Sequence, residues 1–306
     1  MENYWIFKKM KITITGVSGF VGQNLQDYLK QAYEIDTLSI RFLADQMFTL
    51  KTDAIIHLAG KAHDLKGVSK PSEYYEANFE LTKQLFDSFL VSDAKVFVFM
   101  STVKAVADNV AVKLNELEVP DPKTHYGKAK QKAEEYILNK KLTQDKRVYI
   151  LRPCMIHGPG NKGNLNLLYQ LVAKGGPWPL GAFENERSFL TIENLCFVIK
   201  ELLENETIPS GIYNVADDVA FSTNELIQLL GESIGKQAKL WYVSPIMIRS
   251  IAKLGDVLPL PLNSERLQKL TESYVVSNKK IVQAIGKPLP ISSEDGLRLT
   301  FKSFRK

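Results

Sequence analysis

The sequence predicts an α/β protein in which a doubly wound parallel sheet is accompanied by a smaller, mostly helical lobe. Short apolar runs of strand length alternate with helical stretches through the first half of the chain. These runs are apolar on both faces, which is typical of parallel strands covered by helices on both sides. In the second half, proline and glycine cluster between helical stretches, which favours a more irregular lobe.

The first half contains five strand signals with helices between them. Residues 11–15 form a compact strand signal, and a glycine-punctuated turn with a helix over 22–30 follows at once. The other strands are expected over residues 35–40, 53–59, 95–100 and 147–152, with helices over 72–89 and 127–138, then over 165–174, 191–203 and 223–234 in the second half. Ligands of open α/β sheets bind at the carboxyl ends of the strands, so we expect the functional site there.

Length and composition narrow the class of protein. The 306 residues, 45% hydrophobic and 24% charged, can bury a core without a disulfide or metal staple, and we predict no metal site. The two cysteines, Cys154 and Cys196, are too few for a disulfide framework, which favours a reduced, cytoplasmic protein. No apolar stretch approaches the roughly 20 residues of a membrane helix, so no membrane insertion is expected. The net charge of +5 is spread along the chain, which disfavours a nucleic-acid partner and fits an anionic small molecule.

The first motif with chemical meaning is a glycine-rich turn after the first strand. Gly16, Gly19 and Gly22 stand at the spacing of a phosphate-binding turn, with a strand before them and a helix after. Gly16 permits a tight turn, Gly19 lets the backbone approach a pyrophosphate, and Gly22 allows the helix to pack closely on the strand. Such a turn can also be an ordinary loop, but its context favours a dinucleotide site.

Two further patterns suggest acid–base chemistry. Tyr126 and Lys130 are four residues apart and are expected on one face of a helix. A phenol titrates at about pH 10, and a neighbouring ammonium lowers that pKa toward the range where it can act as acid or base. Thr102 follows the strand over 95–100, where a hydroxyl can hydrogen-bond a reacting oxygen. Taken alone, each pattern is better explained by a solvated helix face or by a hydroxyl bonded to its own backbone.

In combination and in this order, the motifs resemble the extended short-chain dehydrogenase/reductase family, in its NAD(P)-dependent branch of nucleotide-sugar epimerases, dehydratases and reductases. The glycine turn is similar to the family's TGxxGFxG, HLAG at residues 57–60 to HLAA, and YGKAK at 126–130 to YxxxK. LRPCMIHGPG at 151–160 resembles LRPxxVYGPG, and ERSFLTIEN at 186–194 resembles RDFxYVxD. The similarity runs from about residue 11 to at least 215 and continues more faintly to the end.

The resemblance implies a role for each matching residue. Tyr126 would be the general acid/base, Lys130 would bind the nicotinamide ribose and lower the pKa of Tyr126, and Thr102 would hold the reacting oxygen. The cofactor would be bordered by Gly16, Gly19, Phe20, Val21, Gly22, Leu58, Ala59, Gly60, Lys61, Asn78, Lys130, Pro153 and Ile156, and the substrate by Thr102, Tyr126, Asn164, Arg187 and Arg266. A Rossmann domain would span residues 10–157 plus about 189–215, and a substrate lobe about 158–188 plus 216–306.

Three departures from the family pattern matter. Where NAD-preferring members carry an acid after the second strand, this chain has Ser39 and Arg41, which could bind a 2′-phosphate. We therefore expect NADP rather than NAD. The segment over 41–53 is short, and we expect it to lack the strand that touches adenine in relatives. His157 replaces the family's tyrosine and is expected to be structural.

The resemblance implies hydride transfer at C4 of a nucleotide-linked sugar, coupled to proton transfer through Tyr126. Dehydratases carry an acid directly after the position of Thr102, whereas Val103 and Lys104 follow here, which disfavours dehydration. We predict an NADPH-dependent 4-keto reductase of a UDP-linked (acetamido)deoxyhexulose. The alternatives are a UDP-sugar 4-epimerase with retained NAD and a non-catalytic dinucleotide-binding sensor, although sensors usually lose the tyrosine or lysine. The resemblance also implies a homodimer formed through helices near 78–90 and 126–138.

Overall fold

The computed structural model describes residues 9–62, 70–110, 112–161, 163, 165–260 and 262–305. Within them, six parallel strands form one sheet in the order β2-β1-β3-β4-β6-β9. The strands are β1 (Lys11–Thr15), β2 (Glu34–Leu38), β3 (Ala54–His57), β4 (Val96–Met100), β6 (Arg147–Pro153) and β9 (Gly211–Val215). Because every pairing is parallel, all six strands end at the same edge of the sheet. The predicted doubly wound α/β class is confirmed.

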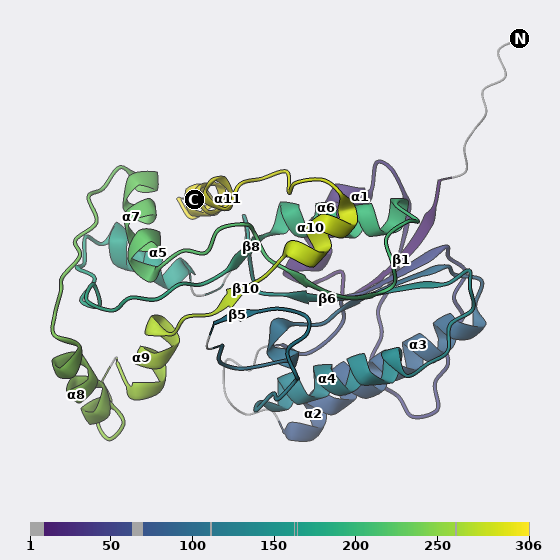
Figure 1. Cartoon of the computed structure of the whole chain (residues 1–306), viewed down its shortest axis with the longest axis horizontal. Helices are drawn as coiled ribbons and strands as arrows, with labels where there is room; N and C mark the ends of the chain where they lie inside the picture. The colour runs from purple at the N-terminus through teal and green to yellow at the C-terminus, as the bar shows by residue number, and fades with distance from the viewer. Residues whose placement is uncertain are drawn as a thin grey trace, which may run out of the picture.

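Helices cover both faces of this sheet (Figure 1). On one face lie α1 (Phe20–Leu29), α6 (Ile192–Glu204) and α10 (Lys279–Ile285), and on the other lie α2 (Pro71–Tyr75), α3 (Leu81–Val91) and α4 (His125–Leu138). Successive residues of a strand point to opposite faces. Ile56 and Val98 therefore pack with α1 and α6, while Ile55 and Phe97 pack with α3 and α4. This arrangement explains why the strands are apolar on both faces.

The stretch predicted as one helix over 72–89 has an irregular centre. Between α2 and α3 the chain forms a π-helical turn, η1 (Glu76–Glu80), in which Asn78 is fully buried. Such turns inside helices occur frequently at functional sites, because they redirect a side chain out of the regular helical register. Among the described residues 39–53 no strand forms between β2 and β3, as expected, so β2 is the edge of the sheet.

The second lobe is smaller and mostly helical, as predicted. It contains α5 (Leu165–Ala173), α7 (Thr223–Ile234), α8 (Pro245–Gly255), α9 (Ser264–Thr271) and α11 (Ser293–Ser303). Its core is separate from that of the sheet and includes Trp178, Phe189, Leu230 and Phe301. Two short parallel pairs join this lobe to the rest, β7 (Met155–His157) with β8 (Phe189–Thr191) and β5 (Lys113–Leu114) with β10 (Val275–Val276).

The chain passes between the two parts more than once. β9 returns to the sheet, and α10 packs Ile281 and Ile285 into the sheet core, although the sequence assigned both residues to the second lobe.

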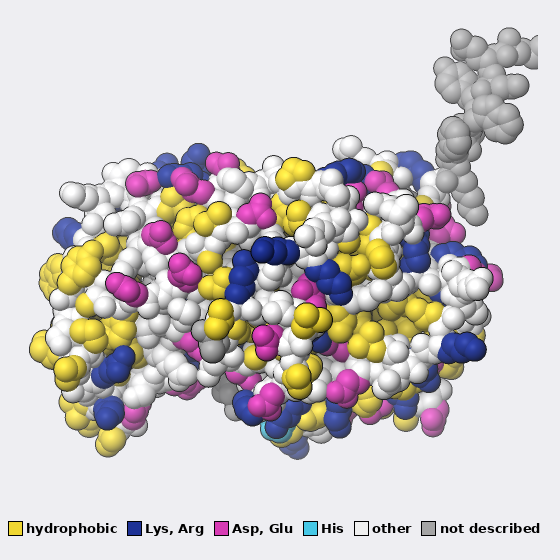
Figure 2. All heavy atoms as spheres, in the orientation of Figure 1, with side chains coloured by type: hydrophobic (Ala, Val, Ile, Leu, Met, Phe, Trp, Pro, Cys, Tyr) yellow, Lys and Arg dark blue, Asp and Glu magenta, His cyan; other side chains and the backbone are white. Residues whose placement is uncertain are grey.

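On the face drawn in Figure 2, side chains of both charge signs are interspersed over both parts. In the part of the chain that the structure describes, no helix is long and apolar enough to cross a membrane.

Candidate active site

The glycine-rich turn lies at the end of β1, on the edge where all six strands of the sheet end. Gly16 has a φ of +72°, and a Cβ there would lie 2.7 Å from the backbone nitrogen of Ala59. A Cβ on Gly22 would lie 2.4 Å from the carbonyl oxygen of Gly16. Gly19 is the N-cap of α1 and provides no side-chain cap, so no side chain of the cap residue occupies the first-turn N–H groups, which are the groups that bind a pyrophosphate at a helix start. The turn therefore fits a dinucleotide.

Ser39 and Arg41 lie beside this turn. Leu38, the last residue of β2, pairs with Thr15, so the chain leaves β2 next to Gly16. Both Ser39 and Arg41 are exposed, and Arg41 forms no ion pair with the described part of the chain. A guanidinium and a hydroxyl at this position can bind a phosphate on the adenosine ribose.

The turn after β3 is held by Asn78. The Asn78 Oδ1 atom accepts a hydrogen bond from the Lys61 backbone nitrogen at 3.0 Å, and Nδ2 donates to the carbonyl oxygens of Lys61 and Tyr74, both at 3.0 Å. These bonds fix residues 58–61 against the π-helical turn. The Lys61 side chain also pairs with Glu73. Asn78 thus holds in place the turn after β3 that is predicted to border the cofactor.

Lys130 and Asn78 both lie against Gly60. A Cβ on Gly60 would lie 2.5 Å from Asn78 Oδ1 and 3.3 Å from Lys130 Nζ, so only glycine leaves room there. The Lys130 Nζ atom donates to the Met100 carbonyl oxygen at 2.8 Å and lies 4.7 Å above the centre of the Phe99 ring. Burial lowers the pKa of Lys130 to about 7, and the negative charge of Glu134 opposes this shift.

Tyr126 and Thr102 are brought together by the start of α4. The Thr124 Oγ1 atom caps this helix by accepting from the Gly127 backbone nitrogen at 3.1 Å. A Cβ on Gly127 would lie 2.4 Å from the Lys104 carbonyl oxygen, so the first turn of α4 packs directly on the chain after Thr102. The Thr102 hydroxyl is close enough to Tyr126 to act on its pKa. Thr102 lies just after β4, Lys130 is bonded to the last residue of that strand, and Tyr126 lies one turn before Lys130 on α4, so all three are placed at this carboxyl edge.

The pKa of Tyr126 differs from the expectation raised by the sequence. Burial disfavours the phenolate and raises this pKa to about 12, against the smaller opposing effect of Thr102. For the protein without a cofactor, the expectation that Lys130 lowers the pKa of Tyr126 is therefore wrong. The Lys130 ammonium is bonded to the Met100 carbonyl, and its own pKa is lowered to about 7, so near neutral pH its positive charge is only partly present.

Sequence reasoning missed two buried networks behind these residues. In the first, Glu134 accepts from Ser101 Oγ and from Arg152, whose Nε lies 3.0 Å from Oε1. Glu134 lies one turn beyond Lys130 on α4. This i, i+4 spacing of opposite charges is the sequence feature from which a contact between the two residues could have been predicted. The network anchors the residue before Thr102, Ser101, to α4 and β6.

The second network centres on His57, which is fully buried. Thr82 Oγ1 donates to the Asn78 carbonyl oxygen, so His57 Nε2 must donate to Thr82 at 3.0 Å. His57 Nδ1 then accepts from Thr15 Oγ1 at 2.8 Å. Burial lowers the pKa of His57 to about 3, which keeps the ring neutral. The ring thus ties the end of β1 to the helix that carries Asn78.

The predicted substrate-side residues lie on the second lobe. Arg187 Nη1 donates to the Lys269 carbonyl oxygen on α9, the helix that also carries Arg266. Lys104, from the sheet side, lies 4.4 Å above the ring of Tyr274, a residue whose backbone bridges to Arg187. Burial lowers the pKa of Lys104, two residues after Thr102, and Arg187 is close enough to that lysine to add a smaller lowering. Asn164 lies outside the described residues.

The remaining predicted residues border the same edge or are structural. Pro153 ends β6, and Ile156 lies in β7. His157 is fully buried, and its Nδ1 atom lies 2.8 Å from Thr300 Oγ1, which agrees with a structural role.

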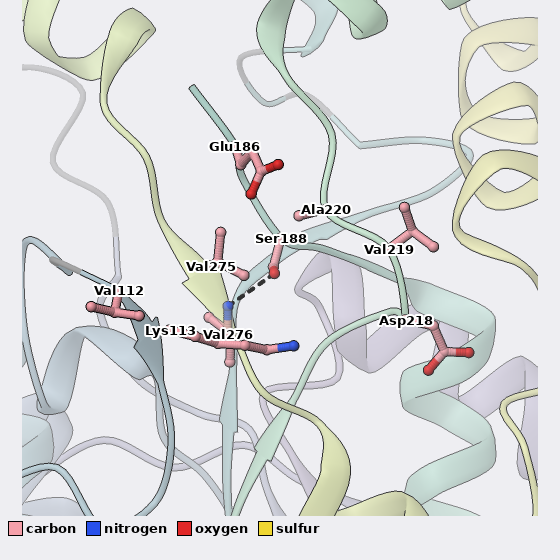
Figure 3. A pocket seen from close by; sticks show the side chains of 9 residues that line it. All are labelled: Val112, Lys113, Glu186, Ser188, Asp218, Val219, Ala220, Val275 and Val276. Carbon is pink, nitrogen blue, oxygen red and sulfur yellow. Dashed lines mark hydrogen bonds between the residues drawn. The ribbon is translucent and has the colours of Figure 1, made fainter. Parts of the chain in front are cut away.

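A separate hollow of about 500 Å³ lies between β5, β10 and the chain after β9 (Figure 3). Ser188 Oγ accepts from the Val276 backbone nitrogen there at 3.0 Å. The lining residues are Val112, Lys113, Glu186, Ser188, Asp218, Val219, Ala220, Val275 and Val276. None of them is a predicted site residue, although Glu186 and Ser188 flank the predicted substrate residue Arg187.

Comparison with known proteins agrees with these features. The model of the NAD dependent epimerase/dehydratase family matches residues 12–216. A UDP-glucose 4-epimerase of Vibrio cholerae is 26% identical over 96% of this chain and 95% of its own length. A GDP-6-deoxy-D-mannose reductase of Pseudomonas aeruginosa is 26% identical over 72% of this chain and 79% of its own length. A structure of RMD from Pseudomonas aeruginosa complexed with NADPH shares the fold, with a TM-score of 0.71, 21% identity and coverage of 97% of this chain and 100% of that chain.

Proposed function

Because the chain belongs to the NAD-dependent epimerase/dehydratase family and is therefore an enzyme, we propose that it reduces the 4-keto group of a UDP-linked (acetamido)deoxyhexulose with NADPH. The resemblance found in the sequence is confirmed at the level of the family. The observation that carries the choice of reductase is the pair Ser39 and Arg41 beside the glycine turn, with no acid at the end of β2 to repel a 2′-phosphate.

The chain's own residues suit this cofactor. The first turn of α1, Ser39 and Arg41 would hold its phosphates, and Asn78 would keep residues 58–61 in place along its ribose and nicotinamide side. When bound, the cofactor would supply the hydride for the sugar carbon.

Proton transfer is assigned to Tyr126. With a pKa near 12 it is protonated at neutral pH, and a protonated acid is the form that a carbonyl reduction requires. The proton would pass from the phenol oxygen to the C4 oxygen of the sugar, which Thr102 would hold by a hydrogen bond. Lys130 would stabilise the phenolate that remains, since proton uptake by a lysine with a pKa of about 7 restores its positive charge.

A 4-epimerase with retained NAD is the second candidate. The similarity to the Vibrio cholerae UDP-glucose 4-epimerase extends over nearly the whole of both chains and supports it. Epimerases would use the same tyrosine, lysine and threonine, so these residues do not separate the two reactions. A non-catalytic sensor is disfavoured, because Tyr126, Lys130 and Thr102 are all present and converge.

Two measurements on the purified protein separate the candidates. We expect no tightly bound nucleotide, and we expect NADPH absorbance to fall when a UDP-linked 4-keto sugar is added. Protein that retains NAD and interconverts UDP-sugars without net consumption of NADPH would instead establish the epimerase.

The homodimer through α3 and α4 remains a proposal. These helices lie side by side on one face of the molecule (Figure 1). Light scattering on the full chain would determine its mass.

A further inference from the structure

The outer end of the second lobe carries a large exposed hydrophobic surface, which we call the α8 surface (residues 241–260). It consists of α8, the two residues Trp241 and Tyr242 before it, and the loop after it. Nine large hydrophobic side chains there are more than a third exposed: Trp241, Tyr242, Ile246, Met247, Ile251, Leu254, Val257, Leu258 and Leu260. Soluble monomers rarely expose contiguous apolar patches of this kind unless the patch binds something.

The buried and exposed side chains of α8 lie on different sides of the helix. Ile248 and Ala252, four residues apart, are 5% and 1% exposed and attach the helix to the lobe. An α-helix advances about 100° per residue, so Met247 and Leu254 lie on the opposite side, where they are 56% and 54% exposed. The exposed side of α8 therefore carries Ile246, Met247, Ile251 and Leu254, with one uncharged polar residue, Ser250, among them.

A strip of positive charge borders this apolar face. Arg249 and Lys253 are exposed, four residues apart, and fall between the buried side and Ile246. Residues 239–260 carry three basic side chains, Lys239, Arg249 and Lys253, and one acid, Asp256, whose carboxylate accepts from the backbone nitrogen and hydroxyl of Ser264 at 2.9 and 2.6 Å. On the adjacent α9, Glu265 is paired with Lys269. Figure 2 shows hydrophobic and basic side chains next to each other at the lower left, over α8.

We propose that the α8 surface docks the protein on an anionic lipid surface, with α8 lying in the plane of the membrane interface. An apolar helix face bordered by basic residues is the pattern by which helices bind lipid headgroups and the outer part of the acyl chains. Trp and Tyr side chains favour that interface, and Trp241 and Tyr242 lie at the start of the surface. The net positive charge of residues 239–260 complements anionic headgroups. This inference goes beyond the proposed reaction and does not depend on it.

Binding of the full chain to vesicles tests the proposal. We expect sedimentation with vesicles of phosphatidylglycerol and phosphatidylcholine, little sedimentation with phosphatidylcholine alone, and weaker binding as salt is raised. The double variant Arg249→Gln, Lys253→Gln changes only exposed polar ends and should bind anionic vesicles about thirtyfold more weakly. The double variant Met247→Glu, Leu254→Glu should lose binding altogether.

Leu299→Glu is the matched control, because Leu299 is a comparably exposed leucine, 45% on α11, outside the α8 surface. It should bind like the wild type. Circular dichroism and NADPH affinity should be unchanged in all variants. The proposal is overturned if the wild type does not bind anionic vesicles, or if the control weakens binding as much as the α8 variants. It is also overturned if the wild type is a dimer without affinity for vesicles and Met247→Glu, Leu254→Glu makes it a monomer, since a second copy would then cover the surface.

Discussion

The carboxyl edge of the sheet and the outer end of the second lobe are built in opposite ways. At the edge, key polar side chains are buried and hydrogen-bonded: Lys130 is bonded to Met100, and Asn78 to Lys61. At the α8 surface, apolar groups are exposed without a described partner. Burying polar groups is tolerated only when they are bonded, and it holds them in one geometry. The contrast indicates that the first region is organised for chemistry and the second for association.

The largest effect on activity is expected at the carboxyl edge of the sheet, from removing the phenol oxygen of Tyr126. Tyr126→Phe deletes the proton donor and leaves the ring in place, so kcat should fall by about a thousandfold or more. The affinity for NADPH, measured by calorimetry, should be unchanged. An active Tyr126→Phe protein would show that another group transfers the proton.

Alanine substitutions at two glycines test how closely the glycine-rich turn is packed at the carboxyl edge. Gly16 and Gly175 both have φ near +71°, so alanine is strained at both by about 1–2 kcal/mol. Only at Gly16 would the new Cβ also meet backbone, at Ala59, whereas at Gly175 nothing lies within 4 Å. Gly16→Ala should therefore lose dinucleotide binding, and Gly175→Ala should keep it. Equal affinities in calorimetry would argue against a closely fitted turn.

Arg41 tests the choice of cofactor. Arg41→Ala removes a charge-assisted contact and should weaken NADP binding by about ten- to a hundredfold. NAD lacks the 2′-phosphate, so its affinity should be unchanged and serves as the control. If both dinucleotides lose the same affinity, Arg41 does not bind the 2′-phosphate.

Lys130 makes the stability of the edge depend on pH. Its folded pKa of about 7 lies below that of a lysine in the unfolded chain, so between these values the unfolded state binds more protons. The free energy of unfolding should therefore rise with pH above about 7, by at most about 1.4 kcal/mol per unit from this group. Urea unfolding at pH 7 and 9 would measure it. Lys130→Met should remove this increment, and the same slope in both proteins would contradict the assigned pKa.

The smallest effect is expected at the α8 surface. Leu254→Glu replaces an exposed side chain, so the free energy of unfolding should change by less than about 0.5 kcal/mol and kcat should be unchanged. Thermal unfolding and the rate of NADPH oxidation without lipid would measure both. A large loss of either would show that this surface belongs to the core or the active site.

Sequence patterns predicted the sheet well, because strands such as Ala54–His57 and Val96–Met100 are apolar on both faces and bounded by turn residues. The convergence of Thr102, Tyr126 and Lys130 followed from the family resemblance. Three features were out of reach because they depend on tertiary neighbours. These are the π-helical turn at Asn78, the packing of α10 on the sheet, and the raised pKa of Tyr126, which burial determines.

The most direct test of the proposed reaction follows a deuterium label from the nicotinamide of NADPH. With a UDP-linked 4-keto sugar, a reductase built on Tyr126 should place the label on C4 of the product, with one NADPH consumed per sugar, and Tyr126→Phe should transfer none. Sugar products that carry no label, formed while NADPH is not consumed, would contradict the account.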